Sequence, residues 1–155
     1  MKVKIVPYSD KYSKYFYDLN YDWLNEFFYV EEYDEKVLKN CKTEIIDKGG
    51  FIFFALSNSE VIGTMSLIQK ERGVYELNKM AVKKDLRGNG IGHQLIKFII
   101  DYSIDKNFES IILYSNTVLK NSIHLYEKFG FKEIDNQDAP YKRSDIKMEL
   151  RLSNL

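Results

Sequence analysis

The residues most suggestive of chemistry lie in the stretch RGNGIG, Arg87 to Gly92, where three glycines alternate with other residues. They follow an apolar segment and precede the pattern of a long amphipathic helix. Glycine lets the backbone approach a ligand closely, and the free amides at a helix N-terminus favour an anion. This stretch therefore predicts a loop that binds phosphate.

Two known phosphate-binding patterns compete with that interpretation. The dinucleotide fingerprint Gly-x-Gly-x-x-Gly follows a first parallel strand, whereas here the third glycine comes one residue early and the preceding strand lies late in the chain. A Walker loop would need Gly-Lys-Ser or Gly-Lys-Thr, which does not follow. A flexible turn without a ligand remains an alternative.

The context of the glycines resembles the GNAT superfamily of N-acetyltransferases. The family motif Arg/Gln-x-x-Gly-x-Gly/Ala is met by Arg87, Gly90 and Gly92, and the segments MAVKKDLRGNGIG and IHLYEKFGF stand at the family's usual separation. The resemblance is most specific from 76 to 131. It implies acetyl-CoA as co-substrate, whose pyrophosphate would be held by Arg87, Gly88, Asn89, Gly90, Ile91 and Gly92. It also implies that the pantetheine arm bonds to the strand at Met80, Ala81 and Val82.

Acetyl transfer from a thioester to an amine needs a neutral amine, a donor to the developing oxyanion and a proton for the departing thiolate. Glu76 lies six residues before Val82, which matches the spacing of the general base in family members that have one. An apolar strand environment would raise the pKa of this carboxyl by desolvation. The alternatives are a solvent-facing carboxylate or an anchor for the substrate amine.

Tyr126, in LYEKFGF, corresponds to the family's tyrosine that donates a proton to the coenzyme A sulfur. The alternative is a tyrosine of the core. The resemblance assigns the thioester oxygen to the backbone amide of Met80, a role that does not depend on its side chain.

One position departs from the family pattern: Leu119 stands where an asparagine often binds the pantetheine. Asn116 or Asn121 would substitute for it, although either is equally suited to a helix cap or a turn. His93 and His124 are expected to face solvent. Their separation, and the lack of a cluster of histidines and carboxylates, argue against a metal site. Cys41 falls on an apolar helix face, where cysteines are usually inert.

The acceptor would lie against the N-terminal helices and the last pair of strands. The substrate-binding candidates there are Trp23, Phe28, Tyr29, Glu31 and Tyr141, with Tyr21, Glu32 and Asp34 nearby. Acidic and aromatic side chains together would suit a cationic amine. The alternative is that the run EEYDE is only a solvated face. Lys79, Lys83 and Lys84 are interpreted as neighbours of phosphates or as plain surface.

These residues need a scaffold, and the hydrophobic pattern supplies one. KVKIVPY predicts a first strand, and Tyr12, Phe16, Leu19, Trp23 and Phe27 predict an amphipathic helix with most of that stripe in the core. Asp34 is expected to cap a second helix that carries Leu38, Cys41 and Ile45 and ends at KGG.

The second half of the chain alternates strands with helices. GFIFFAL, VIGTMSLI and VYELNKMAV predict three antiparallel strands, and the helix after the glycines leads to the parallel strand SIILYS. A short helix from Asn121 to Phe129 precedes two last strands, FKEID and IKMELRL. In VYELNKMAV the apolar alternation changes phase at Asn78 and Lys79, which predicts a β-bulge.

The fold class is therefore α/β (α+β), with 1–155 as a single acetyltransferase domain. The resemblance implies a GNAT fold: a mixed, mostly antiparallel sheet of six to seven strands with about four helices, whose fourth and fifth strands are parallel and splayed apart.

Composition limits the partners. The chain has 23 Lys plus Arg against 23 Asp plus Glu, so no net field favours nucleic acid or an anionic membrane. One cysteine and no long apolar run predict a soluble, unprocessed, cytoplasmic protein. The sequence leaves monomer and homodimer open.

The expected function is transfer of an acetyl group from acetyl-CoA to a primary amine of a small molecule, by direct attack in a ternary complex, without a metal. The alternatives are a non-catalytic module that binds or senses coenzyme A and a regulatory protein that uses its aromatic N-terminal face.

Overall fold

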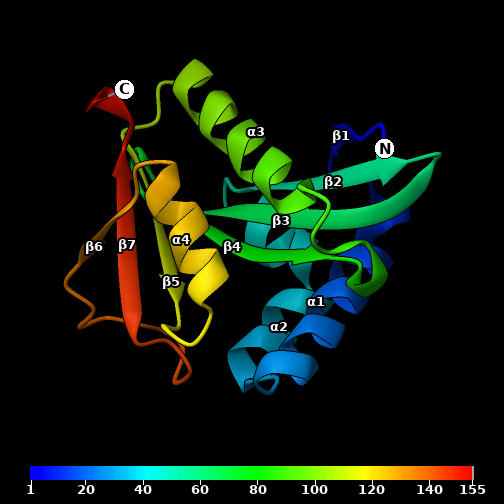
Figure 1. Cartoon of the computed structure of the whole chain (residues 1–155), viewed down its shortest axis with the longest axis horizontal. Coiled ribbons are helices and arrows are strands. Elements are labelled where there is room, and N and C mark those ends of the chain that lie inside the picture. Colours follow the sequence, from blue (N-terminus) through cyan, green and yellow to red (C-terminus); the bar gives the residue numbers. More distant parts are fainter. Residues whose placement is uncertain (155) are drawn as a thin grey trace.

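The computed structural model describes residues 1–154, which build a seven-stranded mixed sheet in the order β1-β2-β3-β4-β5-β7-β6 (Figure 1). The strands are β1 (Lys4–Pro7), β2 (Phe51–Ser57), β3 (Glu60–Glu71), β4 (Val74–Val82), β5 (Ser110–Ser115), β6 (Lys132–Ile134) and β7 (Ile146–Arg151). The α-helices are α1 (Ser13–Phe27), α2 (Glu32–Lys39), α3 (Ile91–Asp105) and α4 (Lys120–Lys128). All neighbouring strands are antiparallel except β4 and β5, so the predicted fold class and strand arrangement are confirmed.

Helices cover both faces of the sheet, and each face has its own apolar core (Figure 1). On one face α3 packs Leu95, Ile96 and Ile99 against the strands, all of them fully buried, and α4 joins the same cluster. On the other face α1 and α2 bury Phe16 and Leu38 against the sheet. On β4, Tyr75 and Leu77 belong to the first core, and Glu76 between them faces the opposite side of the sheet, because side chains alternate along a strand.

The β4 and β5 strands pair for only a short distance. The pairs are Val74 with Ser110, Tyr75 with Ile111, and Glu76 with Ile112. Beyond these pairs β4 continues alongside β3, while β5 turns away with β7, so that the two strands form the arms of a V (Figure 1). The predicted splay between the parallel strands is therefore present, and its apex is at Glu76.

A β-bulge bends β4 at the predicted position. Asn78 pairs with Ser66 of β3, but the next pair along joins Ala81 to Thr64, so β4 has one residue more than β3 in this interval. Lys79 has a φ of 51°, a left-handed conformation that is uncommon for a residue other than glycine, asparagine or aspartate. The bulge directs β4 away from β5.

The second helix differs from its prediction in two respects. Its N-cap is Glu31 rather than Asp34, which occupies the third helical position and accepts a hydrogen bond from the Glu31 amide at 2.9 Å. The helix also ends at Lys39, and a separate π-helical turn, Lys42–Ile46, carries Ile45. The expected stop at KGG is present, with Gly49 at a φ of 89°. In α1 the predicted stripe is buried at Phe16, but Phe27 at its end is 43% exposed.

Candidate functional site

The glycine loop joins the end of β4 to α3. Gly88 and Gly90 have φ values of 82° and 79°, which explains why glycine suits these two positions. Gly92 lies in the first turn of α3, and its φ is not in the left-handed region that favours glycine. A Cβ added to any of the three would meet no atom within 4 Å, so packing against the protein does not require glycine there. The bare backbone faces open space.

The loop also carries unused hydrogen-bond donors. Among the residues that the structure describes, the amides of Gly88, Asn89 and Gly90 donate to no protein acceptor. They continue into the first turn of α3, where helical amides lack partners by geometry. A row of backbone donors next to open space is suited to the oxygens of a phosphate or diphosphate.

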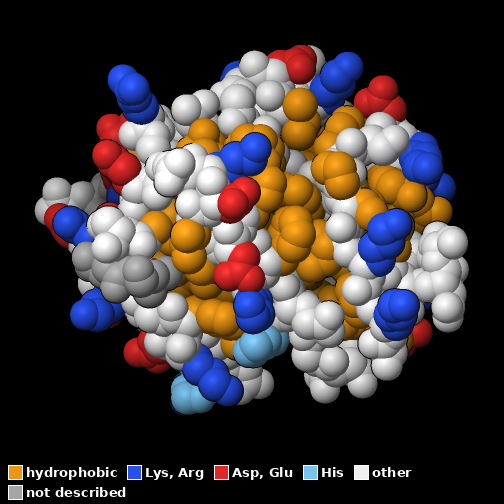
Figure 2. All heavy atoms as spheres, turned by 90° about the horizontal axis from the view of Figure 1, so that it is seen from above, with side chains coloured by type: hydrophobic (Ala, Val, Ile, Leu, Met, Phe, Trp, Pro, Cys, Tyr) orange, Lys and Arg blue, Asp and Glu red, His pale blue; other side chains and the backbone are white. Residues whose placement is uncertain are grey.

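A cavity of about 780 Å³ adjoins this loop. It is lined by the end of β4, the glycine loop, the start of α3, the turn before α4 and one face of α4, and by Trp23 and Phe27 of α1. Its charged or titratable lining residues are Arg87, His93, Lys120, His124 and Lys128, without a carboxylate among them. Figure 2 shows histidine side chains at the surface beside Lys and Arg side chains. The cavity is therefore suited to an elongated anion.

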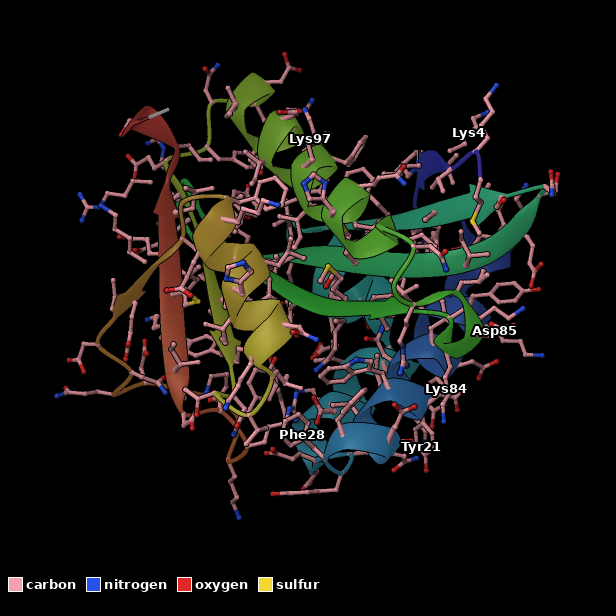
Figure 3. The ribbon with its side chains drawn as sticks, viewed as in Figure 1. Lys4, Tyr21, Phe28, Lys84, Asp85 and Lys97 are labelled. Carbon is pink, nitrogen blue, oxygen red and sulfur yellow. The ribbon has the colours of Figure 1, made fainter. Side chains whose placement is uncertain are left out.

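Arg87 is tied to α1 by its side chain. Its Nη1 lies 2.9 Å from Glu26 Oε2, and its Nε donates to the carbonyl of Val82 at 3.1 Å. Lys84, labelled in Figure 3 in the loop after β4, lies 3.3 Å from the same carboxylate. The guanidinium also sits over the ring of Phe27, 5.4 Å from its centroid. The glycine loop is thus linked to the C-terminal end of α1.

A second cavity, of about 130 Å³, lies within the V between β4 and β5. It meets the larger cavity at residues that line both, namely Trp23, Met80, Leu119 and Ser122. From this junction it extends between Leu77 and Asn78 of β4 and Leu113 and Tyr114 of β5. A long molecule bound at the glycine loop has a path into the sheet past Met80.

Tyr126 lines this second cavity from α4. The side chain is half-buried and packs against Phe131, with 5.9 Å between the ring centroids. Burial raises the pKa of its phenol to about 12. The hydroxyl therefore stays protonated throughout the physiological range and is available as a hydrogen-bond donor.

Glu76 lies at the apex of the V, but it lines neither cavity and is only 1% exposed. Burial raises the pKa of its carboxyl, against the opposing charges of Lys70 and Lys79. Its Oε1 lies 3.5 Å from Lys70 Nζ and, among the described residues, makes no hydrogen bond. Glu76 is therefore a buried carboxylate with one long ion pair, an environment that occurs both at functional sites and in structural ion-pair networks.

The Tyr141 hydroxyl connects Glu76 with the smaller cavity. It donates a long hydrogen bond of 3.5 Å to Glu76 Oε2 and accepts one from the side-chain amide of Asn78, a lining residue. Tyr141 itself is buried, and burial raises its pKa well above the usual value. The hydroxyl can therefore accept and donate at once, as a proton relay requires.

A buried ion cluster forms the wall behind these residues. Asp34 accepts from Arg143 through two nitrogens, at 2.6 and 2.9 Å, and also from the ammonium of Lys79. Although burial opposes it, the hydrogen bonds from Arg143 and the charge of Lys79 hold the pKa of Asp34 below its usual value. The interpretation of Lys79 as a phosphate neighbour or surface residue is wrong, because its side chain is 2% exposed. Nothing in the local sequence signals Arg143, which lies 109 residues from Asp34.

The predicted acceptor residues are divided among different surroundings. Trp23 and Phe28 line the smaller cavity. Figure 3 shows Phe28 where α1 ends, near the open side of the V, and Tyr21 at an earlier position on the same helix. Tyr29 is 52% exposed. Glu31 accepts hydrogen bonds from the amides of 142 and 143 and from the Arg143 side chain, so its charge is already compensated.

The two candidate asparagines also differ. The side chain of Asn116 donates to the carbonyl of Arg143 at 2.6 Å and accepts from the Val118 amide at 2.9 Å. Asn121 lines the larger cavity and makes no side-chain hydrogen bond among the described residues. Of the two, Asn121 has the donors and acceptor available for a ligand. Leu119, between them, is the N-cap residue of α4.

Within 1–154 the structure shows no group of three or more histidines, cysteines or carboxylates placed to hold a metal ion. In the same part of the chain, no helix has the length and apolarity needed to cross a bilayer. Cys41 is buried in the α1–α2 core, and burial raises the pKa of its thiol. His93 and His124 are exposed, as predicted.

Comparison with known proteins places this geometry in a family. Residues 6–131 match the model of the acetyltransferase (GNAT) family. The chain belongs to this family. The matched range includes Glu76, the glycine loop and Tyr126, whereas Tyr141 and Arg143 lie beyond it.

Solved GNAT structures share the fold over almost the whole chain. An acetyltransferase from Staphylococcus aureus Mu50 is 22% identical with a TM-score of 0.86, covering 97% of this chain and 99% of the other. The spermidine N-acetyltransferase of Vibrio cholerae, in complex with CoA and spermine, is 20% identical with a TM-score of 0.74, covering 97% and 96%.

Among curated GNAT relatives, the N-acetylaspartate synthetase of Xenopus tropicalis is 31% identical over 88 residues, which are 56% of this chain and 32% of that protein. The chain spans 28% to 44% of the length of the first curated relatives it matches.

Proposed function

We propose that this protein is an acetyl-CoA-dependent N-acetyltransferase that acetylates a primary amine of a small molecule by direct attack in a ternary complex. The observation that carries the proposal is the continuity of the two cavities. The larger one begins at the free amides of the glycine loop, and the smaller one enters the V between β4 and β5 past Met80. Acetyl-CoA, with a diphosphate at one end and a thioester at the other, fits this arrangement.

The chain offers suitable groups along the whole path. The amides of 88–92 would hold the diphosphate, supported by Arg87, and Asn121 would bond to the pantetheine arm in place of the asparagine that Leu119 replaces. Met80 lies in the bulge, Ala81 and Val82 follow it, and all three line the larger cavity. Acetyl-CoA supplies the activated acyl group, and it is the only cofactor that the proposal requires.

Tyr126 would act on the sulfur. Because the pKa of its phenol is about 12 and that of a thiol is about 8.5, complete proton transfer from Tyr126 to the thiolate is uphill. Donation of a hydrogen bond is therefore the main contribution that we assign to it, and it stabilises charge as the carbon–sulfur bond breaks. The backbone amide of Met80, at the junction of the cavities, would donate to the thioester oxygen.

Glu76 would receive the proton of the amine. Neither Glu76 nor Tyr141 lines a cavity, so the proposal requires a water molecule that takes the proton from the amine and passes a proton to the Tyr141 hydroxyl, which gives its own proton to Glu76. An ammonium has a pKa near 10, so removal of its proton is needed before attack at neutral pH. The raised pKa of Glu76 makes it a stronger base than an exposed carboxylate.

Release of thiol from acetyl-CoA in the presence of an amine panel tests the proposal. Tyr126→Phe and Glu76→Gln should each lower turnover, while Tyr102→Phe and Glu133→Gln, which lie outside both cavities, should not. Full activity in both site variants would reject the assigned roles. Binding of coenzyme A by calorimetry, with no turnover of any amine, would favour instead a module that senses coenzyme A, to which Leu119 also points.

The comparisons leave the charge of the acceptor open. One solved relative was crystallised with spermine, and one curated relative is named for N-acetylaspartate. We further propose that 1–155 acts as one domain, with no requirement for nucleic acid or a membrane.

A further inference from the structure

The charged groups around the smaller cavity have one sign. Its wall includes Lys79 and Arg143 but no aspartate or glutamate. The carboxylates that the sequence suggested for an ammonium are not part of this wall: Asp34 is 0% exposed, and the side chain of Glu31 is 11% exposed and paired with Arg143. The Lys79 side chain is also buried, at 2% exposed, so the charged side chain that a ligand in the cavity would meet is that of Arg143.

Those carboxylates are also neutralised by the protein. Asp34 is shared between Arg143 and Lys79, and Glu31 accepts from the Arg143 side chain at 3.2 Å and from two backbone amides. The four charges sum to zero, so a preference for an anion rests on the donors that Arg143 presents to the cavity and not on a net positive charge.

Arg143 keeps donors for a ligand. A guanidinium has five N–H groups. Its recorded partners are Glu31 Oε2 and Asp34 Oδ2 at Nη1, and Asp34 Oδ1 at Nη2. Nε and one hydrogen of Nη2 have no acceptor among the described residues. The same side chain is 14% exposed and reaches the cavity.

The backbone supports a fixed position for these cations. Lys79 adopts a left-handed φ of 51°, where glycine or asparagine is ordinarily preferred, and its side chain is buried against Tyr141 with 4.8 Å from Nζ to the ring centroid. Arg143 lies on the same ring at 4.4 Å. Asp34 and Glu31 compensate the two cations on this ring, and strained backbone is often retained where it serves a site.

The rest of the wall restricts the acceptor further. Trp23, Leu24 and Phe28 form an apolar side, and the cavity volume is only about 130 Å³. A low-dielectric surround strengthens any charge-assisted hydrogen bond made there. Together these features suit a compact molecule and disfavour a long polyamine.

We infer that the acceptor is a small amine that also carries a carboxylate, as a free amino acid does, and that Arg143 binds this carboxylate while the amine is directed to the thioester. This inference rests on the proposed acetyltransferase function and names its substrate class. Lys79 shares Asp34 with Arg143, whose Nε and second Nη2 hydrogen remain available for a ligand among the described residues.

Matched acceptors test the inference. The panel contains the twenty L-amino acids with β-alanine and 4-aminobutyrate, each beside its carboxamide and its decarboxylated amine, together with spermidine. We expect at least one amino acid to have a kcat/KM about 10- to 100-fold above both of its matched analogues, the range expected for a hydrogen bond to a charged group. Calorimetry with CoA-loaded protein should rank the same compounds in the same order.

Variants assign the effect to Arg143. Arg143→Gln should raise KM for the preferred amino acid by about 10- to 100-fold, with less than about a threefold change for its carboxamide. Since this change leaves Asp34 with one partner fewer, the charge-balanced pair Asp34→Asn with Arg143→Gln is measured as well and should show the same selective loss. Arg151→Gln, at an exposed arginine on β7, is the matched control.

Three results would overturn the inference: analogues without a carboxylate that equal the amino acids, spermidine as the better acceptor, or no binding of any carboxylate-bearing amine to CoA-loaded protein. Failure of the proposed function is distinguishable, because it would appear as a lack of affinity for coenzyme A itself and no consumption of thioester with any acceptor.

Discussion

Replacement of Gly92 by alanine separates the stability of the glycine loop from its binding role. Gly92 is the second residue of α3, its φ is not left-handed, and an added Cβ would meet nothing within 4 Å. Alanine is preferred over glycine inside helices by about 1 kcal/mol, and it also restricts the unfolded chain. Because Gly92 lies in the first turn, we expect Gly92→Ala to raise the free energy of unfolding by about 0.5 to 1 kcal/mol.

That gain should be visible in thermal unfolding. For a chain of 155 residues, about 1 kcal/mol corresponds to a shift in Tm of about 2 to 4 °C, so the variant should melt about 1 to 4 °C higher than the parent. Coenzyme A affinity should change by less than about threefold, because the family motif accepts alanine at this position and an added Cβ meets only open space. Calorimetric titration with coenzyme A measures this affinity.

Two matched variants make the result decisive. Gln94→Ala, on the same helix but outside the cavity, should leave coenzyme A affinity unchanged. Gly90→Ala should reduce both stability and affinity, because the φ of 79° at Gly90 is unfavourable for alanine. Unchanged affinity in Gly90→Ala would refute the reasoning that this loop holds a phosphate, and a lower Tm in Gly92→Ala would refute the helical geometry assigned to Gly92.

Three further predictions concern the ligand path. Tyr126→Phe should lower kcat by about 10²-fold or more while coenzyme A affinity, measured by calorimetry, changes by less than about threefold. The raised pKa of Glu76 places the acid limb of the kcat/KM profile above the usual carboxyl range, and Glu76→Gln should remove that limb. Because the folded pKa exceeds the unfolded one, Glu76 destabilises the fold increasingly as pH rises between the two values; the Gln variant should therefore unfold at higher denaturant than the parent at pH 7 but not at pH 4. Finally, Glu26→Gln should tighten coenzyme A binding several-fold at low salt, since it releases Arg87 from its ion pair, and no change there would contradict a role for Arg87 at the diphosphate.

Local patterns predicted most of the scaffold. The phase change at Asn78 and Lys79 located the bulge, because a strand with one face in an apolar core reveals its register through the alternation of its side chains. The glycines and the helix that follows them located the larger cavity for a similar reason, since backbone conformation and helix ends are governed by nearby residues. Lys79 and Asp34 did not follow their local predictions, because their side chains pair with each other.

Long-range pairing explains what the sequence could not reveal. Asp34 has the chemistry of an N-cap, but its carboxylate is drawn to Lys79 and Arg143, which are 45 and 109 residues away. The run EEYDE looked acidic in isolation, and only the folded chain shows that its charge is compensated at Asp34 and Glu31. Periodicity carries no signal for which distant cation meets a given anion.

The short seam between β4 and β5 has a consequence for the energetics of the sheet. Only three residue pairs connect one group of strands to the other, so beyond Glu76 and Ile112 the facing edges of β4 and β5 do not pair with each other. The pantetheine arm of coenzyme A carries amides, and these would form hydrogen bonds to the facing strand edges. Binding of coenzyme A should therefore slow amide hydrogen exchange along the facing edges of β4 and β5.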